Sequence, residues 1–123
     1  MTTQEIPQEQ WRGYFDQLSE QYQGWGVSIE VLGRELGDQP AVEGLPLQGV
    51  HFETQGSEAG NILVAAGNTA AFLAHHIDHP SHVRVADVKP GEETDLQIES
   101  QDGTTTLIHV RRRPELPPGR RAN

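Results

Sequence analysis

The segment LQIESQDGTTTLIHVR, residues 96–111, carries the strongest hairpin signal of this chain. Its two halves alternate between apolar and polar side chains, which is the period-two pattern of a β-strand with one buried face. Between them stands Asp102-Gly103, a preferred two-residue hairpin turn. The segment therefore predicts an antiparallel hairpin. In the register of a two-residue turn, Ile98 faces Leu107 and Leu96 faces His109 on one side of the sheet.

Short strands separated by turn residues fill most of the remaining chain. Gly, Pro, Asn and Asp interrupt the sequence at short intervals, which is typical of an antiparallel sheet. Strands do not alternate with long helices, so a parallel βαβ architecture is excluded. The continuous apolar run 62–66 is expected to be buried on both faces. We expect strands at residues 27–31, 41–43, 47–53, 62–66, 71–77, 83–88, 96–100 and 105–111.

One helix is expected near the N-terminus, over residues 7–23. Pro7 suits a first helical turn, and Gly24 suits a C-terminal stop. The residues between them carry an aromatic-rich stripe at helical spacing, which requires burial against another element. The predicted fold is α+β: an N-terminal amphipathic helix packed on a curved antiparallel sheet or small β-barrel of about six to eight strands. The stripe consists of Trp11, Tyr14, Phe15, Leu18 and Tyr22.

The composition is that of a small acidic protein. The chain has 123 residues, of which 34% are apolar, and no cysteine, which excludes a disulfide scaffold, thiolate metal sites and cysteine nucleophiles. Residues 1–110 hold 4 basic and 17 acidic residues, a charge of −13, whereas residues 111–123 hold five arginines and one glutamate, a charge of +4. We expect a single domain over 1–110 and a flexible Arg- and Pro-rich tail over 111–123. No apolar stretch approaches the roughly 20 residues of a membrane span, and no secretory signal stands at the N-terminus, so the expected location is cytoplasmic.

The arginines of the tail form a candidate anion-binding site. Recognition of phosphate requires clustered cations, which the acidic body lacks, so nucleic acid is expected to bind through the tail or not at all. A Pro-rich spacer separates two groups of arginines and favours extended conformations. The alternative is a solvated tail without a ligand, which is common at charged chain ends. The candidate residues are Arg111, Arg112, Arg113, Arg120 and Arg121.

Five metal-ligand side chains lie within eight residues, in HHIDHPSH (75–82). In a chain without cysteine, imidazole and carboxylate are the groups available to bind a divalent transition metal. On a strand, His75 and His76 would point to opposite faces and would not share an ion. The spacing matches none of the standard catalytic zinc motifs, and surface histidines also explain it. The candidate ligands are His76, Asp78, His79 and His82; no other cofactor is expected.

Several segments match a known family in their order and spacing. They are Glu5-Ile6-Pro7 followed by Trp11, Gly24-Trp25, EVLGRELG (30–37), EGLPLQGV (43–50), His76-Ile77 through Pro80 to Val83, and IESQDGT (98–104). Over residues 4–110 the chain resembles a family of small uncharacterised bacterial proteins, catalogued as a domain of unknown function. The resemblance implies a single bacterial domain, and it supplies no activity, cofactor or catalytic residue.

The sequence carries no motif of a known catalytic mechanism. It lacks the G-x-S-x-G turn of serine hydrolases, and Lys89, its only lysine, stands in no phosphate-binding loop. We therefore expect a non-enzymatic accessory or binding domain, with a protein partner or a second copy as its ligand. The alternatives are a small metal-binding protein that uses His75–His82 and an anion or nucleic-acid adaptor that uses the arginine tail.

Overall fold

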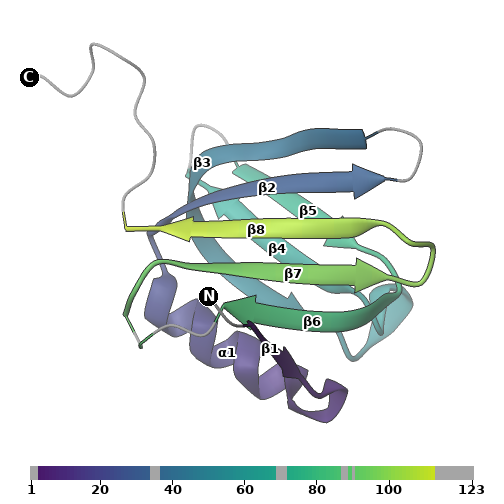
Figure 1. Cartoon of the computed structure of the whole chain (residues 1–123). Helices are drawn as coiled ribbons and strands as arrows, with labels where there is room; N and C mark the ends of the chain where they lie inside the picture. The colour runs from purple at the N-terminus through teal and green to yellow at the C-terminus, as the bar shows by residue number, and fades with distance from the viewer. Residues whose placement is uncertain (1–2, 34–36, 69–71, 87–88, 90, 113–123) are drawn as a thin grey trace, which may run out of the picture.

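The structure, a computed structural model, describes residues 3–33, 37–68, 72–86, 89 and 91–112. Within these residues one helix packs against an open antiparallel sheet of eight strands, an α+β arrangement (Figure 1). The strand order is β1-β6-β7-β8-β2-β3-β4-β5, so β1 and β5 are the two end strands. No helix in the described part of the chain is long and apolar enough to cross a membrane. The elements are β1 (Thr3–Ile6), η1 (Gln8–Gln10), α1 (Trp11–Tyr22), β2 (Gly26–Gly33), β3 (Gly37–Phe52), η2 (Gly56–Glu58), β4 (Ile62–Gly67), β5 (Phe72–Ile77), β6 (Pro80–Ala86), β7 (Thr94–Ser100) and β8 (Thr105–Arg111).

The predicted helix is confirmed as the short 3₁₀ turn η1 followed by α1. Pro7 precedes η1, and the chain leaves α1 through Gly24, whose φ of +88° favours glycine. The aromatic stripe faces the sheet: four of its five side chains are buried and Tyr14 is partly buried. The Trp11 ring meets Phe52 edge to face at 5.3 Å, and its indole N–H donates to the Ile6 carbonyl at 2.8 Å. Through Trp11, the buried face of α1 therefore contacts both β1 and β3.

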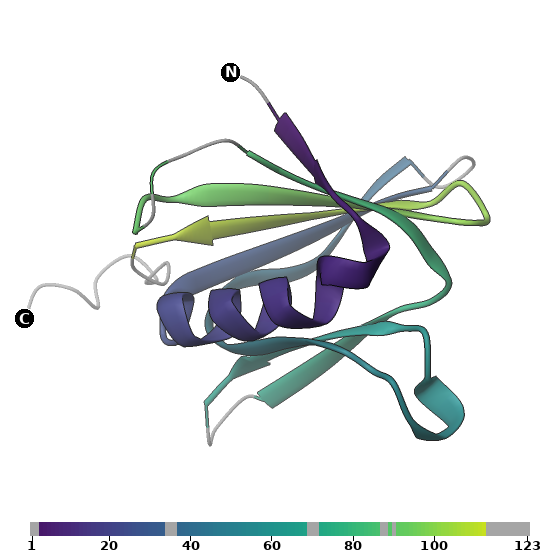
Figure 2. The same ribbon diagram turned by 90° about the horizontal axis from the view of Figure 1, so that it is seen from below.

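Strand β3 is shared by the two halves of the sheet. It pairs with β2 as far as Pro46 and with β4 from Leu47 onward, and Figure 2 shows α1 between the two halves. The two separate strands predicted at 41–43 and 47–53 are therefore wrong. The break expected at Gly44-Leu45-Pro46 lies inside a continuous strand, because Gly44 takes a φ of +65° and the chain bends without leaving the sheet.

The hairpin between β7 and β8 exists, but its predicted register is wrong by one residue. Leu96 pairs with Ile108, and Ile98 pairs with Thr106. The turn has a three-residue loop: the Gly103 N–H donates to the Ser100 carbonyl at 3.0 Å, and the Ser100 N–H donates to the Thr104 carbonyl at 2.8 Å. Since the side-chain period of a strand is two, this shift moves Leu107 and His109 from the expected core face to the opposite face.

Two further differences concern the edges of the sheet. Sequence reasoning missed β1, a four-residue strand with three exposed side chains that pairs antiparallel with β6. The expected burial of 62–66 on both faces is wrong, since Leu63 and Ala65 are only half-buried. Sheet pairing at this end stops at β5, which leaves little to cover the outer face of β4. Residues 71, 87 and 88 of the expected strands 71–77 and 83–88 lie outside the described residues.

Candidate functional site

Strand β5 forms a regular edge at one end of the sheet. It pairs with β4 over six consecutive residues, from Ile62 with Ile77 to Gly67 with Phe72, and the ladder contains no bulge. Among the described strands β5 has a neighbour on one side only, so its second row of backbone groups faces outward. In Figure 2, β5 lies at the margin of the molecule farthest from β7 and β8. An uninterrupted row of backbone donors and acceptors is a template for another strand.

Apolar side chains on β5 are incompletely covered. Ile77 faces the core and is buried, whereas Leu73, on the same face, keeps 39% of its surface exposed. Phe72, on the other face, is 64% exposed. These two are the only large hydrophobic side chains classed as exposed in the described part of the chain. The concentration of apolar surface on one edge strand marks it as the candidate interaction site.

The edge formed by β5 contains no acidic residue, lysine or arginine. Neither β4 nor β5 contains Asp, Glu, Lys or Arg, in a chain with a net charge of −9. Half-burial of the His75 ring, with His76 nearby, lowers the pKa of His75 below its ordinary value of 6.5, although Asp78 opposes this effect. His75 is therefore neutral at pH 7.

The four predicted metal ligands are spread over three environments. Register confirms that His75 and His76 point to opposite faces of β5, since they pair with Val64 and Leu63. After the strand, Asn61 organises the turn: its amide donates to Asp78 Oδ1 at 3.2 Å, and its Oδ1 accepts the His79 N–H at 2.9 Å.

His82 belongs to a different part of the sheet from the other three. Its Nδ1 lies 2.7 Å from Glu5 Oε2, and this contact joins β6 to β1. In the described residues no three His, Asp or Glu side chains converge as metal ligands would, so the structure does not bring His76, Asp78, His79 and His82 together. A transition-metal site in this segment stays a prediction.

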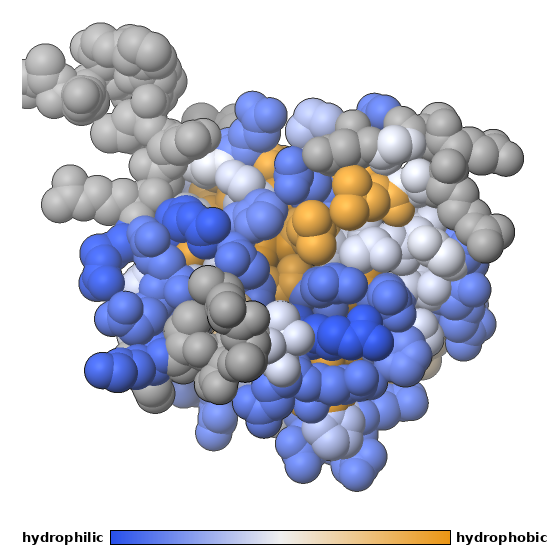
Figure 3. Space-filling model, viewed as in Figure 1, coloured by the Kyte–Doolittle hydropathy of each residue, from blue (hydrophilic) through white to orange (hydrophobic). Residues whose placement is uncertain are grey.

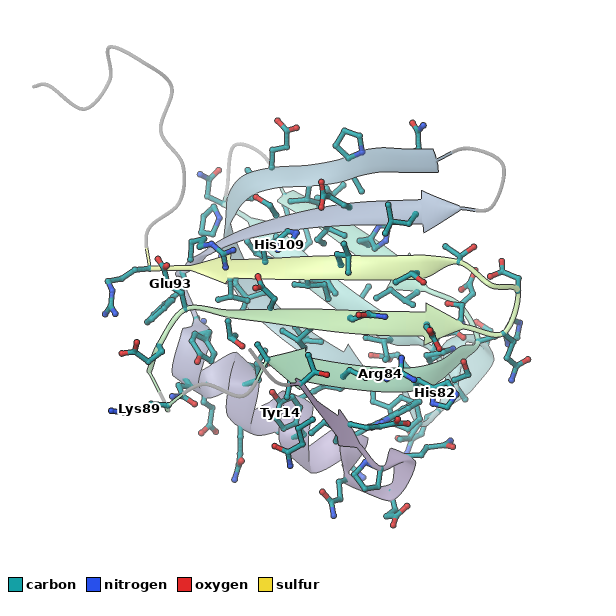
Figure 4. All side chains as sticks on the ribbon, in the orientation of Figure 1. Tyr14, His82, Arg84, Lys89, Glu93 and His109 are labelled. Atoms are coloured by element: carbon teal, nitrogen blue, oxygen red, sulfur yellow. The ribbon has the colours of Figure 1, made fainter. Side chains whose placement is uncertain are left out.

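Ionic contacts extend from His82 across the outer face of the sheet, the face turned away from α1. Arg84 approaches Glu5 at 3.7 Å and Glu99 at 3.4 Å, so one arginine bridges β1, β6 and β7. The hydrogen bond from His82 is the largest of the effects that lower the pKa of Glu5 below 4.5. Figure 4 shows His82 and Arg84 side by side on β6. The edge strand β1 therefore carries a carboxylate in ionic contacts, whereas β5 contains no Asp, Glu, Lys or Arg.

A second ionic cluster on the outer face is centred on His109. Its Nδ1 lies 2.8 Å from Asp95 Oδ1 and its Nε2 lies 3.0 Å from Glu30 Oε1, while Arg111 Nη1 donates to Asp95 at 3.0 Å. This cluster was not predicted from the sequence, because the expected register placed His109 on the other face. Most of the surface around it is hydrophilic, with an apolar patch near the middle of this face (Figure 3). Leu32 on β2 and Leu107 on β8 are half-buried.

Two of the five candidate anion-binding arginines are described, and both contact the sheet. Arg111 ends β8, and besides Asp95 it donates to the Thr94 carbonyl at 3.2 Å. The Arg112 guanidinium lies over the Trp25 ring at 5.3 Å, and its backbone N–H donates to the Glu93 carboxylate at 2.9 Å. Arg113, Arg120 and Arg121, with the rest of the tail, lie outside the described residues. Anion binding by the tail stays a prediction.

These features define a small α+β domain whose charged outer face contrasts with one apolar, uncharged sheet edge. The chain belongs to the family of unknown function DUF5335, which it matches over residues 2–119. It is also 31% identical, over 117 residues, to an uncharacterized protein of Aquifex aeolicus (strain VF5); the aligned region covers 95% of this chain and 97% of that protein. The expected resemblance to a bacterial family of unknown function is confirmed. The search of solved structures found no match.

Proposed function

We propose that this protein is a cytoplasmic binding domain without catalytic activity, and that it works by pairing β5 with β5 of a second copy. The single observation that carries the proposal is the bulge-free, uncharged edge strand with Phe72 and Leu73 exposed on it. Addition of a strand supplies hydrogen bonds to the outward row of backbone groups, and the exposed apolar side chains provide the buried contact.

A second copy is the occupant that the charge distribution favours. Each chain carries a net charge of −9, so most of its surface repels an identical surface. Strands β4 and β5 lack charged residues, which makes this end of the sheet the place where two copies approach with least repulsion. Antiparallel strands pair with their own sequence about a twofold axis, so one edge serves both partners.

The opposite edge is unsuitable for the same contact. Strand β1 has four residues, and its Glu5 is held by His82 and Arg84. Charged side chains and short length are the usual protection of edge strands against pairing, and β5 has no charged side chain. We further propose that the sheet is a curved, incomplete barrel around α1, which the second copy extends at β5 rather than closes.

Sedimentation of the untagged full chain tests this proposal. We expect a species of two 13.6 kDa chains in the wild type and a monomer in Phe72→Lys, since a lysine on an edge strand blocks pairing. The matched control is Thr3→Lys, which adds the same charge to the exposed edge at β1 and should stay dimeric. The proposal is contradicted by a wild type that is monomeric up to about 1 mM, the range of weak association, or by a dimer that survives Phe72→Lys. Circular dichroism of each variant shows that the fold is intact.

A further inference from the structure

Symmetry restricts the pairing of two β5 strands to a few registers. Residues that lie opposite each other on antiparallel strands point to the same face of the sheet. A twofold axis that pairs two copies of one strand runs perpendicular to the sheet, so it keeps each residue on the same face in both copies. Opposite residues are therefore both even-numbered or both odd-numbered, and one residue faces itself on the axis. The registers with the largest overlap inside β5 place either Ala74 or His75 there.

The register with His75 on the axis leaves the exposed side chains of β5 poorly matched. Leu73 then faces Ile77 of the second copy, a side chain that is only 2% exposed and already packed in its own core. Phe72 faces Asp78, which lies beyond the strand and whose carboxylate accepts a hydrogen bond within its own turn. This register therefore places the exposed phenyl ring opposite a carboxylate.

The register with Ala74 on the axis gives both exposed apolar side chains a partner. Phe72 faces His76 of the second copy on the outer face, and Leu73 faces His75 of the second copy on the face that carries the core. Both imidazole rings retain exposed surface, so each has area to bury in such a contact. Half-burial, the largest effect on His75, lowers its pKa, and a neutral ring suits a contact with a leucine. The twofold axis repeats each contact.

Small side chains permit a close approach at this axis. Ala74 pairs with Ala65 on β4, and Ala65 pairs with Gly49 on β3, so no side chain in this row is larger than a methyl group. The Cβ atoms of opposite residues on antiparallel strands stand about 4.5–5.5 Å apart, a spacing that two alanines meet without a clash. Phe72 lies two residues from Ala74 on the same face, so its ring has room to reach the second copy beside the axis.

We propose that β5 recognises its own copy about a twofold axis at Ala74, with Phe72 packed on His76 and Leu73 packed on His75 of the second copy. This inference rests on the proposed self-pairing of β5 and adds the register and the residues that determine it. It gives the adjacent histidines a role that requires no metal ion: their rings cover the exposed apolar side chains of the other chain. A shift of the register by two residues would replace every one of these contacts.

Disulfide formation between two different single-cysteine variants of the full chain measures the register. One variant of each mixture is labelled with ¹⁵N, so that mass spectrometry separates the mixed disulfide from disulfides within one variant. Phe72→Cys with His76→Cys should cross-link efficiently, because opposite Cα atoms lie about 4.5–5.5 Å apart, within disulfide range. The mixed pair keeps one intact contact between Phe72 and His76 on the other side of the axis. Leu73→Cys with His75→Cys should also cross-link efficiently.

The matched control is Ala74→Cys with His76→Cys. These two positions are opposite only when His75 lies on the axis; in the proposed register they are diagonal neighbours about 7–8 Å apart and should give little mixed disulfide. Efficient cross-linking of this control, with little for Phe72→Cys and His76→Cys, would overturn the register and leave the self-pairing of β5 standing. Equal cross-linking in all three mixtures would show contact without a fixed register and would also overturn the inference. Little cross-linking in every mixture would contradict the self-pairing itself.

Discussion

His109 Nδ1 lies 2.8 Å from Asp95 Oδ1, and this contact joins β8 to β7 on the outer face of the sheet. The other ring nitrogen lies 3.0 Å from Glu30 Oε1 on β2. A neutral imidazole has one donor and one acceptor, so it satisfies only one of two flanking carboxylates, whereas the imidazolium donates to both. This geometry therefore favours the protonated ring, which links β8 to its two neighbours, β7 and β2.

Protonation of His109 makes stability depend on pH. Burial alone would lower the pKa of His109, but its hydrogen bonds to Asp95 and Glu30 and their charges outweigh this and raise the pKa above 6.5. A folded-state pKa above the unfolded value means that the stabilisation is fully present below about pH 6.5 and is lost as the pH rises through the folded-state pKa. As the pH rises from about 6.5 through the folded-state pKa, we expect the free energy of unfolding to fall by about 1 kcal/mol or less, because the cluster is partly exposed.

Urea unfolding of the wild type and His109→Gln at about pH 6 and about pH 9 isolates this contribution from other titrating groups. The difference in free energy of unfolding between the two proteins should be larger at the lower pH. A difference that is the same at both pH values would show that the ring is not preferentially protonated in the folded state. Asp95 does not titrate over this range. Burial acts to raise the pKa of Asp95, but hydrogen bonds from His109 and Arg111 outweigh burial and lower the pKa, so the stabilisation that the Asp95 carboxylate provides is lost only at acidic pH.

Ser19 takes the place of a missing strand beside β3. Its hydroxyl accepts the Val50 N–H at 2.8 Å and donates to the Val50 carbonyl at 3.0 Å. Ser19→Ala leaves both backbone groups without a partner and should reduce the free energy of unfolding by about 1–3 kcal/mol. Ser81→Ala is the matched control, because the Ser81 hydroxyl donates to the Glu99 carbonyl in an exposed position and should cost about 0.5 kcal/mol or less. Equal losses measured by urea unfolding would contradict this role of Ser19.

Two glycines of the helix region should respond in opposite directions to alanine. A Cβ added at Gly13 or at Gly24 meets no atom within 4 Å, so packing does not distinguish them. Gly13 lies in α1, where Gly13→Ala should stabilise the protein by about 0.5–1 kcal/mol. Gly24 has a φ of +88°, where Gly24→Ala should destabilise it by about 1–2 kcal/mol. Thermal unfolding of both variants measures the signs; a stabilising Gly24→Ala would contradict the observed backbone conformation.

The sequence predicts those elements of the fold that depend on local patterns. The spacing of the aromatic stripe identifies α1, and alternation identifies most strands, because both patterns report directly which side chains are buried. The register of the last hairpin was not predictable from Asp102-Gly103 alone. That dipeptide also fits a longer loop with Gly103 at positive φ, here +92°, and the choice between the loops decides which face every side chain of β8 occupies.

The candidate sites were less predictable than the fold. The cluster at His109 depends on that register and on β2, which is distant in sequence. The apolar edge depends on strand order, because the exposure of Phe72 and Leu73 follows from the terminal position of β5 in the sheet and not from their own segment. The segment 75–82 is rich in potential metal ligands, yet β5 and the turn after it place their side chains in separate parts of the structure.

Disulfide cross-linking at β5 is the sharpest test of self-assembly through this edge. The chain has no cysteine, so a single cysteine placed in turn at each of residues 72–77 reports only contact between two copies. Antiparallel pairing about a twofold axis predicts efficient cross-linking at the one or two positions nearest the axis and little at the ends of the strand, because a disulfide requires Cα atoms within about 7 Å. Thr3→Cys on β1 should not cross-link. Uniform or absent cross-linking along β5, or stronger cross-linking at Thr3→Cys, would contradict antiparallel pairing of two copies through β5.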